Sequence, residues 1–205
     1  MPDTAPLDYE EKGWAAGFRF VVGVDEVGYG PVAGPVVVAA VALHPGQRFE
    51  GANDSKLLTE KQREEMASRI CGECLAHRVA AASAREIERL NVRSAAILAM
   101  RRAIAALPFE PDLLLVDGRP APSLGEHRAI VRGDRRCHSI ACASIVAKVL
   151  RDDLMRRLDP RYPEYGWASN KGYRTRRHMR ALFELGPTPH HRRTFHGVLQ
   201  TELGL

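Results

Sequence analysis

The sequence predicts an α/β fold, a mixed β-sheet flanked by helices, and three observations support this prediction. Two apolar, β-branched runs, residues 18–24 and 36–43, lie on either side of a glycine- and proline-containing loop, which is typical of a hairpin. Later strand-like runs alternate with helical patterns, which indicates strands joined by crossover helices. A hydrophobic content of 45% in 205 residues suits one domain of ordinary size.

The two ends of the chain are expected to lie outside this domain, which we place at residues 18–160. Residues 1–17 have neither the basic region nor the apolar region of a secretory signal, and we expect a flexible lead. Residues 161–205 predict a helical, basic C-terminal extension packed on the domain, broken by Gly-Pro and Thr-Pro pairs. No apolar run reaches about 18 residues, so no membrane span is expected.

Helix-start signals mark the first half of the chain. Residues 59–62 and 83–86 are capping-box patterns, which predict helices from Glu60 to about Cys74 and from about residue 84. Residues 78–82 predict a strand between these helices, and Asn91 is a cap for a third helix. The apolar stripe of that third helix is expected at Ile97, Met100, Ile104 and Leu107.

The second half of the chain predicts two short strands and a long helix. Residues 113–116 and 129–131 are apolar runs of strand length. The helix that follows ends at Asp159-Pro160, and its core-facing side is expected to carry Ile140, Ala143, Ala147, Leu150 and Leu154.

Carboxylates follow three of these predicted strands. Asp25 and Glu26 follow the first strand, Asp117 follows residues 113–116, and Asp134 follows residues 129–131. Ligands gather at the ends of strands in α/β sheets, and oxygen donors suit Mg²⁺ or Mn²⁺ better than zinc. The alternative is that these acids are ordinary turn residues.

The charge and the cysteines indicate a compartment and a class of partner. The formal net charge is +5, and residues 171–196 are rich in Lys, Arg and His with interleaved aromatics, which suits nucleic acid; the alternative is a solvated face. Four cysteines (Cys71, Cys74, Cys137 and Cys142) fit reduced thiols and a cytoplasmic protein better than a structural zinc site.

The ordered set of motifs closely resembles bacterial ribonuclease HII. The matching segments are residues 23–35, 53–56, 115–118, 132–134, 143–149 with Arg151 and Asp152, 162–166, 171–173 and 186–193. The resemblance implies an RNase H-like fold with residues 18–160 as the catalytic domain. It also implies cleavage of the RNA strand of RNA–DNA hybrids and incision at ribonucleotides in duplex DNA, with 5′-phosphate and 3′-hydroxyl products. Ribonucleotide removal and primer clearance are the implied roles, and a monomer is expected.

Carried over by position, the resemblance implies a role for each candidate site residue. Asp25, Glu26, Asp117 and Asp134 would be the catalytic carboxylates and the ligands of a two-metal site for Mg²⁺ or Mn²⁺. Gly28, Tyr29 and Gly30 would form the loop that recognises a 2′-hydroxyl, and Tyr173 would stack on the sugar at the ribonucleotide junction. Ser55 and Lys56 suit a phosphate. Alternatives are a core position for Tyr173, a surface turn for Ser55 and Lys56, and simple ion pairing for Asp152.

Two positions depart from the family pattern; Arg132 at a usual lysine position keeps its charge, whereas the change at Tyr29 matters more. The family has arginine or sometimes lysine where this chain has Tyr29, so a cationic contact to phosphate is lost there. The end of the chain, with Gln200, Leu203 and Leu205, is similar to a sliding-clamp-binding peptide; the alternative is an ordinary terminal helix. Two rival functions are the sister enzyme ribonuclease HIII, which has an extra N-terminal domain, and a non-catalytic nucleic-acid-binding module, which would lack the four acids.

Overall fold

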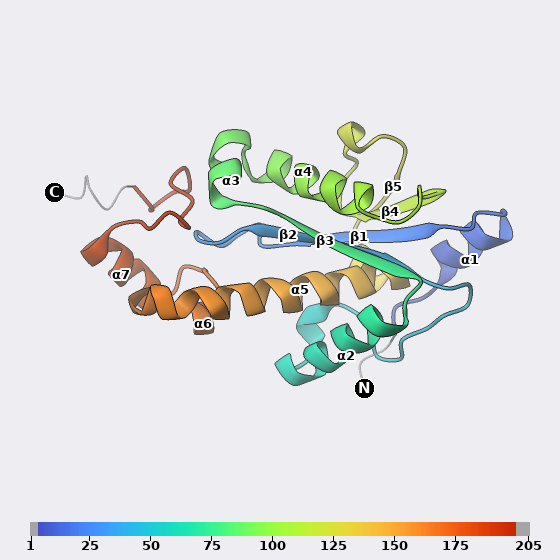
Figure 1. Cartoon of the computed structure of the whole chain (residues 1–205), viewed down its shortest axis with the longest axis horizontal. Helices are drawn as coiled ribbons and strands as arrows, with labels where there is room; N and C mark the ends of the chain where they lie inside the picture. The colour runs from blue at the N-terminus through green and yellow to red at the C-terminus, as the bar shows by residue number, and fades with distance from the viewer. Residues whose placement is uncertain (1–3, 200–205) are drawn as a thin grey trace.

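A five-stranded mixed sheet forms the centre of the computed structural model, which describes residues 4–199 (Figure 1). The strand order is β3-β2-β1-β4-β5, with β1 (Val21–Val27), β2 (Val36–Ala42), β3 (Ala76–Ala82), β4 (Leu113–Asp117) and β5 (Arg128–Ile130). The pairs β1–β2 and β2–β3 are antiparallel, whereas β1–β4 and β4–β5 are parallel. The predicted hairpin and mixed sheet are therefore confirmed.

Helices cover both faces of this sheet (Figure 1). The helices α2 (Glu60–Glu73) and α5 (His138–Leu158) lie on one face, and α3 (Ala84–Leu90) and α4 (Val92–Ala105) lie on the other. Both predicted capping boxes are present, at Thr59 and Ser83, and the Asn91 side chain caps α4. Single-turn 3₁₀ helices span Ser55–Leu57, Pro122–Leu124, Gly133–Arg135, Asp159–Arg161 and Pro163–Tyr165.

Two predicted helix faces were only partly right. On α4 the buried side is made mainly of small residues, Ala95, Ala99 and Ala103, with Met100, because they let the helix approach the sheet closely. On α5 the expected core residue Leu150 is 43% exposed. The chain buries Arg151 one position further along the same helix, which a hydrophobic pattern cannot anticipate.

The first residues form structure where a flexible lead was expected. Residues of α1 (Asp8–Ala15) pack beside the start of α5, and Glu10 is fully buried. Its Oε1 accepts hydrogen bonds of 2.6 Å from both the backbone N–H and the hydroxyl of Ser139. This carboxylate caps the first turn of α5 from outside the helix. The expectation for residues 1–17 is therefore wrong for the described part.

The C-terminal segment packs at the opposite end of α5 (Figure 1). It contains α6 (Trp167–Asn170) and α7 (Arg176–Leu185), and Trp167 and Leu182 share an apolar cluster with Val32 and Met155. The boundary near residue 160 stays a prediction. Between residues 4 and 199, none of the helices has both the length and the apolar composition needed to cross a bilayer.

Candidate active site

A cleft of about 480 Å³ opens where the carboxyl ends of the parallel strands meet. Every candidate site residue from the sequence lines it, although their roles stay predictions. These residues are Asp25, Glu26, Gly28, Tyr29, Gly30, Ser55, Lys56, Asp117, Asp134 and Tyr173.

Strand register brings two of the acids together. Val24 of β1 pairs with Val116 of β4, so the next residues along the two strands, Asp25 and Asp117, are neighbours. The first strand begins and ends three residues later than expected, so Asp25 and Glu26 lie within β1 and not after it. Because successive side chains point to opposite faces, Asp25 faces the Ser144 hydroxyl of α5, whereas Glu26 lines a second hollow of about 180 Å³ beside α4.

A close contact between β1 and α5 permits this arrangement. A Cβ atom at Gly23 would lie 2.3 Å from the backbone carbon of Ser139, so only glycine fits there. The backbone of β1 therefore touches the first turn of α5, and the cleft-facing residues of α5 lie directly over Asp25.

Burial raises the pKa of all four carboxyl groups, and repulsion by neighbouring carboxylates raises it further for Asp25, Glu26 and Asp134. The pKa of Asp25 is well above its usual value because of burial and then the charges of Glu26 and Asp117. Burial and Asp117 raise the pKa of Glu26 to about 8. Burial also raises the pKa of Asp117 and of Asp134. Such crowding of like charges is costly unless a cation compensates it.

Loops fix the remaining acids and Lys56. The Asp117 Oδ1 atom accepts a 2.5 Å hydrogen bond from the N–H of Gly133, which begins the 3₁₀ turn that carries Asp134. Asp54, which is 2% exposed, accepts a 3.0 Å hydrogen bond from the backbone of Lys56 and pairs with Arg135 at 2.7 Å. These contacts hold the Lys56 backbone at the rim of the cleft.

Sequence reasoning missed two polar residues of this cleft, Ser144 and Lys148 on α5. They are four residues apart, so they lie on one helix face; that spacing was the signal that could have identified them. Lys148 donates a 2.8 Å hydrogen bond to Asp152, which is 5% exposed. Asp152 thus pairs with Lys148, and neither of the two partners expected for it, Arg151 and Arg156, makes this contact.

The basic C-terminal run is not one continuous surface. Its exposed cations are Arg174, Arg176, Arg177, Arg180 and Arg193. Arg192, His178 and His191 are 0–1% exposed, and the two histidine Nε2 atoms lie 2.9 Å apart. Tyr173 is 46% exposed at the edge of the cleft, so the alternative of a core tyrosine is wrong.

The donors in the cleft fit a hard divalent cation. Its candidate ligands are carboxylate oxygens whose mutual repulsion a cation would relieve. Among residues 4–199, no three His, Cys, Asp or Glu side chains already stand as a closed metal-binding group. All four cysteines are free, and Cys71 and Cys74 are partly buried.

Comparisons with known proteins agree with this geometry. A family model described as Ribonuclease HII matches residues 22–198. A ribonuclease HII of Cereibacter sphaeroides (strain KD131) is 53% identical over 205 residues, covering 96% of this chain and 95% of that protein.

Solved structures share the fold. The ribonuclease H2 of Pyrococcus horikoshii OT3 has a TM-score of 0.78 at 26% identity, covering 90% of this chain and 97% of that one. The ribonuclease HII in a PCNA complex from Archaeoglobus fulgidus has a TM-score of 0.68 at 27% identity, with 84% and 92% covered. Bst-RNase HIII in complex with Mn²⁺ has a TM-score of 0.65 at 19% identity, with 90% and 69% covered, which shows the fold alone.

Proposed function

The chain belongs to the ribonuclease HII family and is an endoribonuclease that acts on the RNA strand of RNA–DNA hybrids, and we propose that the cleft between β1, β4 and α5 is its active site. The observation that supports this proposal is the meeting of Asp25, Glu26, Asp117 and Asp134 in one cleft with raised carboxyl pKa values. A non-catalytic binding module has no need for such a costly cluster.

Asp25, Glu26, Asp117 and Asp134 would hold Mg²⁺ or Mn²⁺. When bound, such an ion supplies Lewis-acid stabilisation of the charge that develops at the cleaved phosphodiester. A related protein, Bst-RNase HIII, has been solved with Mn²⁺. In this proposal the carboxylates stay ionised because the cation offsets their repulsion, and the products carry a 5′-phosphate and a 3′-hydroxyl.

The other cleft residues bind and orient the substrate. Lys56 and Lys148 both line the cleft and suit the phosphates next to the cleaved bond. Tyr173, half-exposed and 3.7 Å from the position of a Cβ on Gly30, suits stacking on a sugar. The loop at Gly28 and Gly30 brings backbone groups close to a 2′-hydroxyl, the group that distinguishes RNA from DNA.

This arrangement extends the proposal to single ribonucleotides embedded in duplex DNA. We also propose a monomer located in the cytoplasm. The clamp-binding prediction at Gln200, Leu203 and Leu205 lies outside the described residues; a PCNA complex of a related ribonuclease HII makes a pull-down with a sliding clamp the appropriate test.

Replacing Asp117 with Asn tests the active-site assignment. Cleavage of an RNA–DNA hybrid in Mg²⁺ should fall at least about a hundredfold, whereas binding of the hybrid is retained. An Asp112→Asn variant is the control, since Asp112 lies outside the cleft and accepts hydrogen bonds from the backbone of Arg19 and Phe20. A folded Asp117→Asn protein that cleaves at the wild-type rate would contradict the assignment.

A further inference from the structure

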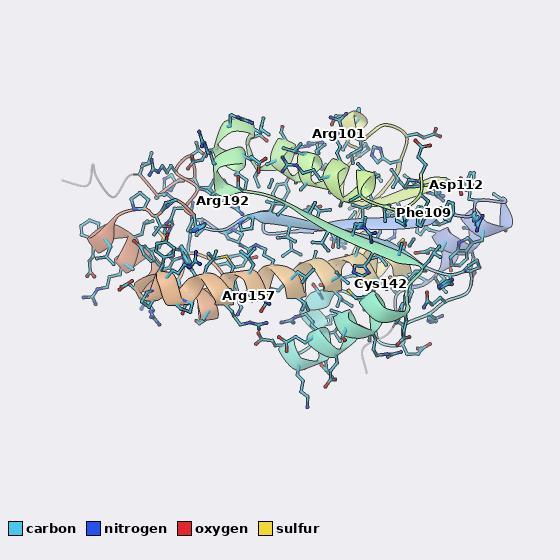
Figure 2. The ribbon with its side chains drawn as sticks, viewed as in Figure 1. Arg101, Phe109, Asp112, Cys142, Arg157 and Arg192 are labelled. Carbon is cyan, nitrogen blue, oxygen red and sulfur yellow. The ribbon has the colours of Figure 1, made fainter. Side chains whose placement is uncertain are left out.

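Arg192, whose side chain is labelled in Figure 2, is buried and contacts the loop that carries the two cleft glycines. Its side chain is 0% exposed and donates hydrogen bonds to three backbone carbonyls. Nη2 reaches the carbonyl of Gly28 at 2.6 Å, Nη1 reaches that of Tyr29 at 3.1 Å, and Nε reaches that of Gly34 at 3.0 Å. One guanidinium therefore binds two successive peptide groups of the loop.

Arg192 is costly to bury because no carboxylate of the described residues forms an ion pair with it. Burial, and then the nearby charge of Arg151, lower the pKa of Arg192 to about 9. An apolar residue would fill this volume at lower cost. The three hydrogen bonds to the loop carbonyls account for an arginine at this buried position.

Those hydrogen bonds fix the direction of the loop's N–H groups. In a planar trans peptide the carbonyl of one residue points opposite to the N–H of the next. With the carbonyls of Gly28 and Tyr29 turned toward Arg192, the N–H groups of Tyr29 and Gly30 point away from it, on the side of the cleft that these residues line. Neither N–H donates a hydrogen bond to another described residue.

For two successive carbonyl groups to bind the same guanidinium, the backbone between them must adopt an unusual conformation. Gly28 has a φ of +108°, and a Cβ there would lie 2.4 Å from Arg151 Nε and 2.7 Å from the carbonyl of Pro35. Only glycine fits this position. Successive N–H groups that face one side form a concave donor site for an oxygen atom.

We propose that Arg192 is a positioning residue for ribonucleotide recognition: by holding the carbonyls of Gly28 and Tyr29, it presents the N–H groups of Tyr29 and Gly30 to the 2′-hydroxyl oxygen of the substrate. This inference rests on the proposed function, in which the loop reads that hydroxyl. Arg192 lies behind the loop and touches no substrate itself.

Arg151 provides a matched control. It is also 0% exposed and donates to three backbone carbonyls, those of Ala33, Pro35 and Lys171. None of these belongs to Gly28 or Tyr29. The Arg151 side chain does pack against Gly28 through its Cδ and Nε atoms, and a lysine at this position keeps the Cδ contact. Replacing Arg151 therefore removes a buried guanidinium with the same number of hydrogen bonds but leaves both loop carbonyls bound to Arg192.

The test compares the affinity of full-length variants for two duplexes that differ by one 2′-hydroxyl. Binding is measured by fluorescence anisotropy in Ca²⁺, under conditions in which a gel shows no cleavage. The selectivity is the dissociation constant for the all-DNA duplex divided by that for the duplex with one ribonucleotide. Arg192→Lys should lower this selectivity at least about fivefold, the loss of one hydrogen bond, because an ammonium group cannot span three carbonyls.

Arg151→Lys should leave the selectivity within about twofold of the wild type, although both variants lose thermal stability. Unchanged selectivity in folded Arg192→Lys, or an equal fall in Arg151→Lys, would overturn the inference. An equal loss of affinity for both duplexes would also overturn it, because the loop would then contact phosphate. A wild-type protein without selectivity would instead refute the proposed recognition of single ribonucleotides.

A measurement on the wild-type protein keeps the inference testable if Arg192 variants do not fold. The amide resonances of Tyr29 and Gly30 are followed by NMR during titration with each duplex. Both should shift further with the ribonucleotide duplex than with the all-DNA duplex. Identical shifts with the two duplexes would contradict the proposed direction of these N–H groups.

Discussion

Replacing Glu26 with Gln should stabilise the cation-free protein while removing its activity. The folded protein holds the pKa of Glu26 at about 8, through burial and the charge of Asp117, whereas the usual value is 4.5. Between these two values the folded state binds more protons than the unfolded state, so stability falls as pH rises. The amide that replaces the carboxyl group carries no proton to lose, which removes this contribution.

The size of the effect follows from the pKa difference. Each pKa unit corresponds to about 1.4 kcal/mol, so ionisation of Glu26 opposes folding by about 3 kcal/mol at pH 7 and by less than about 1 kcal/mol at pH 5. Because the Glu26 side chain is partly exposed, solvent screening reduces these values. We expect the stability of Glu26→Gln relative to wild type to increase by about 2 kcal/mol between pH 5 and pH 7.

Urea unfolding in EDTA at pH 5, 6 and 7 measures this difference. Glu11→Gln, a neutralised exposed acid on α1, is the control and should show no such pH trend. Added Mg²⁺ should stabilise the wild type more than Glu26→Gln, because a ligand that binds the folded state raises its stability. If Glu26→Gln is less stable than wild type at pH 7 in EDTA, the carboxylates do not repel one another as argued.

Three further predictions concern recognition and the buried histidines. Tyr29→Arg should tighten binding to an RNA–DNA hybrid and steepen its salt dependence by about one phosphate contact; an unchanged slope would show that residue 29 faces no phosphate. Tyr173→Ala should cleave at a single ribonucleotide at least about tenfold more slowly than Tyr173→Phe, since stacking needs the aromatic ring. Equal activities of the two variants would contradict a stacking role for Tyr173. The pKa of His191 is lowered to about 3 by burial and then by the charges of His178 and His190. Between about pH 6.5 and pH 3 only the unfolded state binds a proton at this histidine, so acid destabilises the protein. His191→Gln should therefore reduce the loss of stability from pH 7 to pH 5 by about 2 kcal/mol, and an unchanged loss in urea unfolding would contradict this.

Local signals in the sequence predicted most of the fold because they act over a few residues. The capping boxes at Thr59 and Ser83 and the cap at Asn91 are complete within four residues, and all three are present. Long-range contacts were not predictable in this way. Glu10 bonds to Ser139 across 129 positions, and nothing in the sequence of the N-terminal segment indicates that partner.

The cleft was predictable where its residues follow strands. Asp117 comes directly after an apolar run and Asp134 follows another one within three residues, so strand topology gathers them with Asp25. The residues on α5 were harder to identify, because Ser144 and Lys148 lie next to a run of buried small and apolar residues that reads as an ordinary core helix. Their place in the cleft depends on the close contact of α5 with Gly23, which is a property of packing.

The basic C-terminal run shows why a count of charges is a poor guide to a nucleic-acid surface. Residues 171–196 contain seven Lys and Arg side chains, which as a uniform surface would give a salt dependence of about −6 for log K against log salt. Arg192 contributes nothing to that slope, because it is bound to backbone carbonyls, and Lys171 is only 14% exposed. The five exposed arginines limit this segment to a slope of about −4.5. Arg192 instead orients the loop N–H groups that bind the 2′-hydroxyl oxygen. Neighbouring cations in one short segment therefore have different roles: the surface arginines strengthen binding to any nucleic acid, and the buried arginine favours RNA.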